Sequence, residues 1–355
     1  MSASLRVGVV GYGLAGSVFH APLIAATPGL RVSALVTSDP ARQARAHTDY
    51  PDATIHANVE ALLAQPGALD LVVVAAPNRA HVTAGIAALE AGLPIVVDKP
   101  VASSVAEAER LLEAARRTGK LFTVFQNRRW DNDFLTLRHL IAQDALGRVV
   151  RLESRFERFR PEVRPDAWRE RADPAEGGGL LFDLGAHLID QARLLFGQPV
   201  SVYAESDARR GGATVDDDTF IALRFAGGEV AHLWASVVPR EPGPRYRAVG
   251  MRGTYEKRGL DPQEDALAGG ARPGDPGWGQ ETPERWGRLI TDVGGLTVAG
   301  TVETLPGAYE AYYAQVRDAL AGQAAPPVDP EDSIAVLRII ESARASARTG
   351  AVVRV

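Results

Sequence analysis

The stretch Leu5-Arg6-Val7-Gly8-Val9-Val10-Gly11-Tyr12-Gly13-Leu14-Ala15-Gly16 decides the fold of this chain. Its apolar first half predicts a strand, and residues 17–26 can form a helix directly after the glycines. A strand, a G-x-G-x-x-G loop and a helix in this order are typical of dinucleotide binding, because the glycines allow a tight turn and a close approach of pyrophosphate to the helix N-terminus. The residues predicted to bind the cofactor here are Gly11, Tyr12, Gly13, Leu14, Ala15 and Gly16.

Strand and helix patterns alternate after this loop. Strands are predicted at residues 32–36, 71–75, 94–97 and 121–125, and helices at residues 79–91 and 105–117. This alternation predicts a Rossmann-type, doubly wound parallel sheet. In such open α/β sheets, ligands bind at the edge formed by the carboxyl ends of the strands.

The end of the second strand bears on the choice of cofactor. NAD-binding domains place a carboxylate about 20 positions after the glycines, but this strand ends in Thr37 and Ser38. These hydroxyls, together with Arg42, could bind a 2′-phosphate, which favours NADP. Asp39 could instead repel that phosphate, serve NAD, or cap the next helix. We therefore expect NADP, with NAD as the alternative.

Two further strand ends are predicted to lie at the same edge. Ala76-Pro77-Asn78 and His81 follow one strand, and Asp98-Lys99-Pro100 ends the next. Asn78 could bind a ribose or cap a helix, and His81 could contact the cofactor or lie on the surface. Lys99 would point into the cleft, or be an ordinary solvated lysine.

The second half of the chain contains the stretch 177–190, Gly-Gly-Gly-Leu-Leu-Phe-Asp-Leu-Gly-Ala-His-Leu-Ile-Asp. If a helix runs from about Leu180, then Asp183 and His187 lie one turn apart on one face. This helix could present an acid and an imidazole together. The alternative is an ordinary amphipathic helix with a half-buried histidine.

A different pattern follows residue 125. Residues 148–160 alternate between apolar and charged, residues 220–236 suggest a hairpin with a glycine turn, and residues 246–251 suggest another strand. These features predict an antiparallel or mixed sheet in a second, α+β domain, with the helix at 177–196 against it. The acidic run at 216–218 is predicted to be a solvated turn and not a metal site. We expect domains at 1–125 and 126–330, and a C-terminal helix and tail at 331–355 that could return to the first domain.

Composition narrows the class of protein. A chain of 355 residues favours two domains. The 39 basic and 44 acidic side chains give a net charge of −5, which offers no general attraction to nucleic acid or anionic membranes. The absence of cysteine excludes thiol chemistry and disulfides, and the apolar runs are too short to span a bilayer. A cytoplasmic protein is the expectation.

Taken in order, the glycine loop, the Ala-Pro-Asn and Asp-Lys-Pro segments and the 177–190 stretch resemble the Gfo/Idh/MocA oxidoreductase family. The resemblance implies that Lys99, Asp183 and His187 form a catalytic trio. Asp98 departs from the glutamate that commonly begins the family's lysine-proline motif. Residues 125–135, 160–170 and 259–267 are more similar to the NADP-dependent scyllo-inositol dehydrogenase branch of that family.

This resemblance implies the reversible oxidation of a secondary hydroxyl on a cyclic polyol or sugar. His187 would be the general base, Lys99 would stabilise the alkoxide, and Asp183 would bind another hydroxyl or tune Lys99. Further candidates for the substrate pocket are Asn127, Arg128, Trp168 and Tyr246, and further candidates for the cofactor pocket are Asp98, Lys99, Asn127, Trp168 and Arg169.

Three other expectations concern the assembly of the protein and its alternative functions. The family's open sheet face implies a homodimer or homotetramer. A rival function is a non-catalytic dinucleotide-binding sensor or co-repressor. Another rival is the same chemistry on an aldose, a dihydrodiol or an imine.

Overall fold

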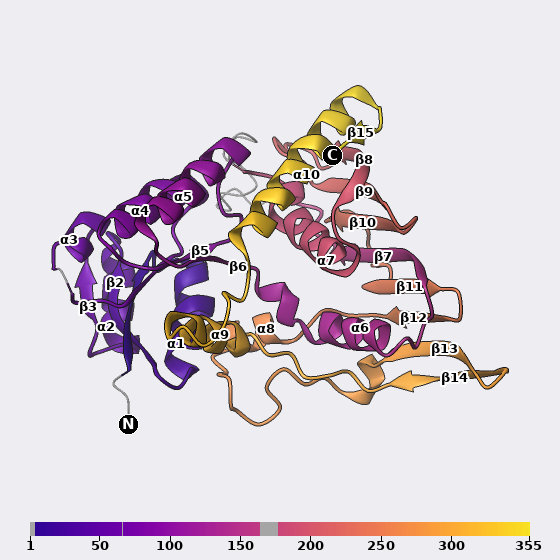
Figure 1. The fold of residues 1–355 in the computed structure, drawn as a ribbon, viewed down its shortest axis with the longest axis horizontal. Coiled ribbons are helices and arrows are strands. Elements are labelled where there is room, and N and C mark those ends of the chain that lie inside the picture. Colours follow the sequence, from indigo (N-terminus) through magenta and orange to yellow (C-terminus); the bar gives the residue numbers. More distant parts are fainter. Residues whose placement is uncertain (1–3, 66, 164–176) are drawn as a thin grey trace. The chain divides into compact units, whose positions relative to one another are not determined.

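The computed structural model describes residues 4–65, 67–163 and 177–355, and it divides into two compact units (Figure 1). Unit 1 comprises Met1–Trp130, Gln263–Trp278 and Ala308–Ile334. Unit 2 comprises Asp131–Pro262, Gly279–Gly307 and Ala335–Val355. Each unit therefore takes three separate segments of the chain. The final residues, for which the sequence left a return to the first domain open, belong to unit 2 from Ala335 onward.

Unit 1 contains a six-stranded parallel sheet in the order β3-β2-β1-β4-β5-β6. The strands are β1 Leu5–Val10, β2 Leu30–Val36, β3 Thr54–His56, β4 Leu71–Val74, β5 Ile95–Asp98 and β6 Phe122–Phe125. The order reverses between β1 and β4, which is the topological switch point of a doubly wound sheet. The predicted Rossmann fold is thus confirmed.

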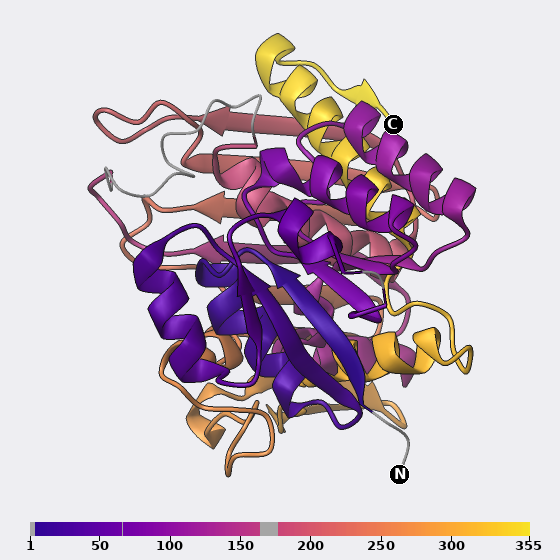
Figure 2. The ribbon, with the colours of Figure 1, turned by 90° about the vertical axis from the view of Figure 1, so that its left-hand side faces the viewer.

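Helices cover both faces of this sheet. They are α1 Ala21–Ala26, α2 Pro40–Asp49, α3 Val59–Leu63, α4 Asn78–Glu90, α5 Val105–Thr118, α8 Gln263–Ala268 and α9 Glu310–Leu320, with a 3₁₀ turn at Asn127–Trp130. Helices α4 and α5 lie side by side on one face, and α1 and α9 lie on the other (Figures 1 and 2). The sequence predicts one helix after the glycine loop, but the first part, Ala15–His20, is a π-helix that leads into α1.

Helix α9 completes the core of unit 1 from the far end of the sequence. Tyr312 and Tyr313 are fully buried, and their rings lie 4.9 and 5.9 Å from the Phe125 ring. The Tyr313 hydroxyl is 2.6 Å from Nδ1 of His20, which precedes α1. Aromatic packing therefore joins residues almost 300 positions apart.

Unit 2 contains a nine-stranded mixed sheet in the order β14-β13-β12-β11-β7-β10-β9-β8-β15. The strands are β7 Val149–Glu157, β8 Pro199–Asp207, β9 Asp218–Phe225, β10 Val230–Ser236, β11 Tyr246–Gly250, β12 Gly253–Lys257, β13 Gly287–Val293, β14 Leu296–Val302 and β15 Val353–Arg354. Strands β7 and β10 pair in parallel, and the other pairs are antiparallel. The expected hairpin of β9 and β10 is confirmed, whereas the hairpin of β13 and β14 was not foreseen.

One face of this sheet is covered by helices. The unit 2 helices are α6 Asn132–Ala142, the π-helix Leu181–Gly185, α7 Ala186–Phe196 and α10 Pro330–Thr349, the last of which crosses from unit 1 into unit 2 at Ala335. Helix α7 packs on β7 and β10 (Figure 1). Leu152, Ser154 and Phe156 of β7 are buried, whereas Glu153 and Arg155 between them are not. The predicted alternation of β7 is therefore confirmed.

Candidate functional site

Steric fit explains each glycine of the loop after β1. Gly11 has φ +100°, and a Cβ there would lie 2.6 Å from the carbonyl oxygen of Ala75. A Cβ on Gly16 would lie 1.9 Å from the carbonyl oxygen of Gly11. Among the described atoms, a Cβ on Gly13 would meet only Nη1 of Arg42, at a distance of 3.6 Å. The second glycine thus borders open space, as required where a pyrophosphate must come close to the backbone.

The other residues of the loop hold it in place or border it. Tyr12 is buried and donates its hydroxyl to Asp49 Oδ2 at 2.7 Å, and burial raises the pKa of Tyr12 well above its usual range. This bond fastens the loop to the end of α2. Leu14 is 62% exposed, and Ala15 begins the π-helix. The residues present fit a dinucleotide at this loop.

Asp39 at the end of β2 is a helix cap. Its Oδ1 atom accepts hydrogen bonds from the backbone N–H groups of Ala41 (2.9 Å) and Arg42 (3.0 Å). Its Oδ2 atom lies 3.8 Å from Arg42 Nε. The capping role foreseen for Asp39 is confirmed. Thr37 beside it is buried and Ser38 is exposed.

His81 connects two of the predicted cofactor segments. Its fully buried ring places Nδ1 2.9 Å from the carbonyl oxygen of Pro100 and Nε2 2.8 Å from that of Ala76. The surface position considered for His81 is therefore wrong. Asn78 is also buried, and α4 begins at Asn78 with Pro77 as its N-cap, so the capping role considered for Asn78 is wrong too.

Asp98 anchors the segment that carries Lys99. Its Oδ1 atom accepts the backbone N–H of Lys99 at 2.9 Å and lies 3.6 Å from Nε2 of the buried His20. Burial alone would raise the pKa of Asp98, but the electrostatic interactions with His20, His81 and Lys99 outweigh it and lower this pKa. His81 thus joins the segments that follow β4 and β5, and Asp98 lies next to His20 at the end of the first π-helix. Lys99 itself is half-buried.

In unit 2, the stretch after the triple glycine begins with a wide helical turn. The sequence predicts a regular helix from about Leu180, but Leu181–Gly185 is a π-helix and α7 starts at Ala186. Asp183 lies in the π-helix and is half-buried, whereas His187 is only 3% exposed. Single π-turns within helices are frequent at functional sites.

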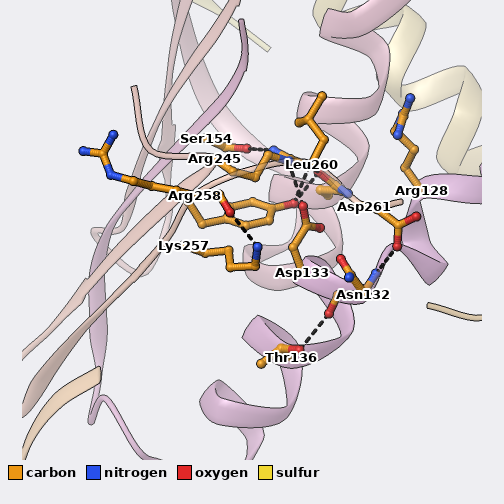
Figure 3. Close-up of polar contacts among 12 residues, drawn as sticks. Arg128, Asn132, Asp133, Thr136, Ser154, Arg245, Lys257, Arg258, Leu260 and Asp261 are labelled. Carbon is orange, nitrogen blue, oxygen red and sulfur yellow. Dashed lines mark hydrogen bonds and ion pairs between the residues drawn. The ribbon is translucent and has the colours of Figure 1, made fainter. Parts of the chain in front are cut away.

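His187 lies beside a buried polar network that the sequence did not reveal. Its ring is edge-on to Phe156 of β7, with centroids 6.3 Å apart. The guanidinium of Arg245 covers the same phenyl ring at 4.0 Å. Arg245 donates to Asp133 Oδ2 (3.1 Å), Ser154 Oγ (2.6 Å) and Gln191 Oε1 (2.9 Å), partly visible in Figure 3.

This network joins four elements of unit 2. Asp133 belongs to α6, Ser154 to β7 and Gln191 to α7, one turn after the histidine. Tyr246 of β11 is fully buried and donates its hydroxyl to Gln191 Oε1 at 2.7 Å. The Tyr246 hydroxyl, a predicted substrate contact, is thus engaged inside the unit.

The remaining candidates lie elsewhere. Asn127 and Arg128 are buried in the 3₁₀ turn of unit 1, where Arg128 Nη2 donates to Glu264 Oε2 at 2.5 Å. Trp168 and Arg169 lie outside the described residues.

The acidic run before β9 is not the solvated turn that was predicted. Asp217 is 1% exposed, and its Oδ2 atom accepts from Arg210 Nε at 2.8 Å. Asp216 accepts the backbone N–H of Leu181 at 2.7 Å. No metal-binding group of three acidic or histidine side chains occurs among the residues that the structure describes.

Comparisons with known proteins agree with this geometry. The family model "Oxidoreductase family, NAD-binding Rossmann fold" matches residues 5–126, and "Oxidoreductase family, C-terminal alpha/beta domain" matches residues 138–355. The chain is 42% identical to the uncharacterized oxidoreductase YdgJ of Escherichia coli over 98% of each chain. It is 38% identical to scyllo-inositol 2-dehydrogenase (NADP(+)) IolW of Bacillus subtilis over 97% of this chain and 94% of that one.

Solved structures extend the likeness to three dimensions. The structure of YvaA from Bacillus subtilis has a TM-score of 0.94 at 36% identity and covers 100% of this chain and 99% of its own. The structure of YPO2259 from Yersinia pestis has a TM-score of 0.93 at 38% identity, and the match covers 100% of this chain and 98% of that one. Within the described ranges of the chain, no helix is long and apolar enough to cross a membrane.

Proposed function

Because the chain belongs to the Gfo/Idh/MocA family and is an NAD(P)-dependent oxidoreductase, we propose that it oxidises a secondary hydroxyl of a scyllo-inositol-like cyclic polyol reversibly to a ketone. The observation that carries this proposal is the 38% identity, over nearly the whole chain, to a scyllo-inositol 2-dehydrogenase. The presence of Lys99, Asp183 and His187 supports it.

The proposed roles follow from the chemistry of these side chains. A bound nicotinamide dinucleotide supplies the hydride acceptor. His187 takes the hydroxyl proton on a ring nitrogen, because an imidazole titrates near neutral pH. Lys99 donates to the oxygen as negative charge develops on it, and Asp183 orients a neighbouring hydroxyl. Lys99 belongs to unit 1, and Asp183 and His187 belong to unit 2.

We also propose that the cofactor is NADP. Asp39, the only carboxylate close to the end of β2 in sequence, has one oxygen engaged by two backbone N–H groups and the other near Arg42. Arg42, which also lies nearest to Gly13, is then available to a 2′-phosphate together with Ser38. NAD is the alternative, because Asp39 remains exposed.

The decisive experiment is a panel of inositol isomers and aldoses, each tested with NADP and with NAD, in which the absorbance of the reduced nicotinamide is followed. We expect the fastest reduction with scyllo-inositol and NADP. Turnover of an aldose, a dihydrodiol or an imine alone would move the substrate to another class. Cofactor binding without turnover of any member would favour the sensor or co-repressor function.

The open face of the nine-stranded sheet is the proposed interface between copies of the chain. It is lined by Arg155, Phe220, His232 and Trp234, all of them half-buried. The rings of Phe220 and Trp234 lie 5.0 Å apart, and the Arg155 guanidinium covers Trp234 at 3.9 Å. An aromatic cluster with an arginine is typical of protein interfaces. We propose a homodimer or homotetramer in the cytoplasm.

A further inference from the structure

The turn that leads into α7 is held by a residue outside the predicted site. The first N–H groups of a helix have no partner within the helix and must find one elsewhere. Leu180 donates its backbone N–H to the carbonyl oxygen of Asp216 at 3.0 Å. Leu181 donates its own to Asp216 Oδ2 at 2.7 Å. Asp216, in the loop before β9, thus accepts hydrogen bonds from the backbone N–H groups of two consecutive residues.

The fit around Asp216 is close on every side that the structure describes. Thr219 donates its hydroxyl to Asp216 Oδ2 at 3.1 Å. Gly179 has φ +93°, and a Cβ there would lie 1.9 Å from Asp216 Oδ1. The last residue of the triple glycine must therefore lack a side chain because the carboxylate takes its place.

The hydrogen bonds to Asp216 oppose the cost of burying its carboxylate. Burial raises the pKa of Asp216 above its usual range, and the hydrogen bonds from Leu181 and Thr219 and the charge of Arg344 offset only part of this rise. A carboxylate at a helix N-terminus also interacts favourably with the helix dipole. Asp183 follows two residues after Leu181 and donates its backbone N–H to Gly179 at 3.1 Å. A shift of this turn therefore moves Asp183 with it.

We propose that Asp216 is a positioning residue, which fixes the turn carrying Asp183, and the start of the helix carrying His187, in the geometry that proton transfer needs. The inference rests on the proposed function. It predicts that loss of the Asp216 carboxylate lowers turnover and leaves the cofactor site of unit 1 intact. A displacement of about 1 Å in a catalytic group can cost about 100-fold in rate.

The test compares Asp216→Ala, Asp216→Asn and the control Asp218→Asn. Asp218 is the neighbouring acid, paired with Arg209 at 3.4 Å on the surface. We expect Asp216→Ala to lower kcat by about 10- to 100-fold and to shift the pH profile of kcat/KM, with the Kd for NADPH unchanged. Asp216→Asn, which keeps one acceptor oxygen, should recover most of the rate, and Asp218→Asn should match the wild type.

Hydrogen exchange separates this inference from the proposed function. The amide of Leu181 should exchange faster in Asp216→Ala whether or not the polyol is the substrate, because this variant removes its acceptor oxygen. Absence of turnover in the wild type would defeat the proposed function but leave this readout intact. Wild-type exchange at the Leu181 amide would overturn the inference, and so would a wild-type rate and pH profile in folded Asp216→Ala. If Asp216→Ala does not fold, the same comparison is made with Gly179→Ala, in which the new Cβ meets the carboxylate.

Discussion

At the scale of single residues, the glycines of the loop after β1 should differ in how well they tolerate a side chain. Gly16→Ala places a Cβ 1.9 Å from a backbone oxygen, which cannot move away as a flexible side chain could. We expect this variant to lose about 1–3 kcal/mol of unfolding free energy. Gly13→Ala meets only the end of Arg42, so it should fold with nearly wild-type stability but bind NADPH about tenfold or more weakly. Thermal unfolding and NADPH titration together distinguish the two variants, and equal stability losses would contradict the assignment.

His187 allows a direct test of the proposed base. The variant His187→Ala should lower kcat by about 10²–10⁴ because the hydroxyl proton loses its acceptor. Cofactor affinity should not change, since the glycine loop belongs to the other unit. His139→Ala, an exposed histidine of α6, is the control. Wild-type turnover in His187→Ala would remove His187 from the role of base.

The sequence predicts those functional residues whose interaction partners are close to them in the chain. The glycine motif was recognised because its meaning depends on the adjacent strand and helix. Asp216 was read as part of a solvated turn because its partner, Leu181, is 35 positions away. Arg245 was missed for the same reason, since Asp133 is 112 positions away. A charged residue gives no local signal that it will be buried beside an opposite charge.

At the scale of elements, the strands were easier to predict than the helix starts. Most strands of unit 1 are apolar runs because the sheet is covered on both faces, and the sequence predicts them within a few residues, whereas the short and partly exposed β3 is not predicted. Neither π-helix is predicted, since the pattern of apolar residues does not distinguish a π-helical turn from an α-helical one. Strand β14 was missed because its residues are nearly all exposed, so it lacks the alternation of a half-buried strand.

The buried ion pair of Arg245 and Asp133 should contribute strongly to the stability of unit 2. Both side chains are at most 1% exposed, so Arg245→Met leaves the Asp133 charge buried without its partner. We expect a loss of about 3–5 kcal/mol in the free energy of unfolding. Arg247→Met removes a guanidinium that is 38% exposed and should cost about 1 kcal/mol or less. Urea unfolding of both variants provides the comparison, and similar midpoints would show that the buried network contributes little.

At the scale of the whole molecule, local patterns predicted the kinds of unit but not their segments. The sequence suggested consecutive domains, whereas each unit is assembled from three stretches of chain. Residues 308–334 join unit 1 because the tyrosines of α9 fill the space beside Phe125 and His20. Nothing in the periodicity of α9 indicates which apolar surface it will cover. The contiguous domain of 1–125 would therefore lack part of its own core.

Association of chains is the last property that the proposed interface predicts. Trp234 lies within the open face, beside Phe220 and beneath Arg155, so Trp234→Arg places a second positive charge in the centre of the patch. If two copies meet there, each brings this charge into a dehydrated contact without a partner, which is strongly unfavourable. We expect light scattering after gel filtration to show a dimer or tetramer for the wild type and a single chain for Trp234→Arg. Val352→Arg, at an exposed site of the C-terminal tail, should keep the wild-type mass. If Trp234→Arg has the same mass as the wild type, the chains associate through another surface. The next residues to test would then be Leu296 and Val298, which are exposed apolar residues of β14.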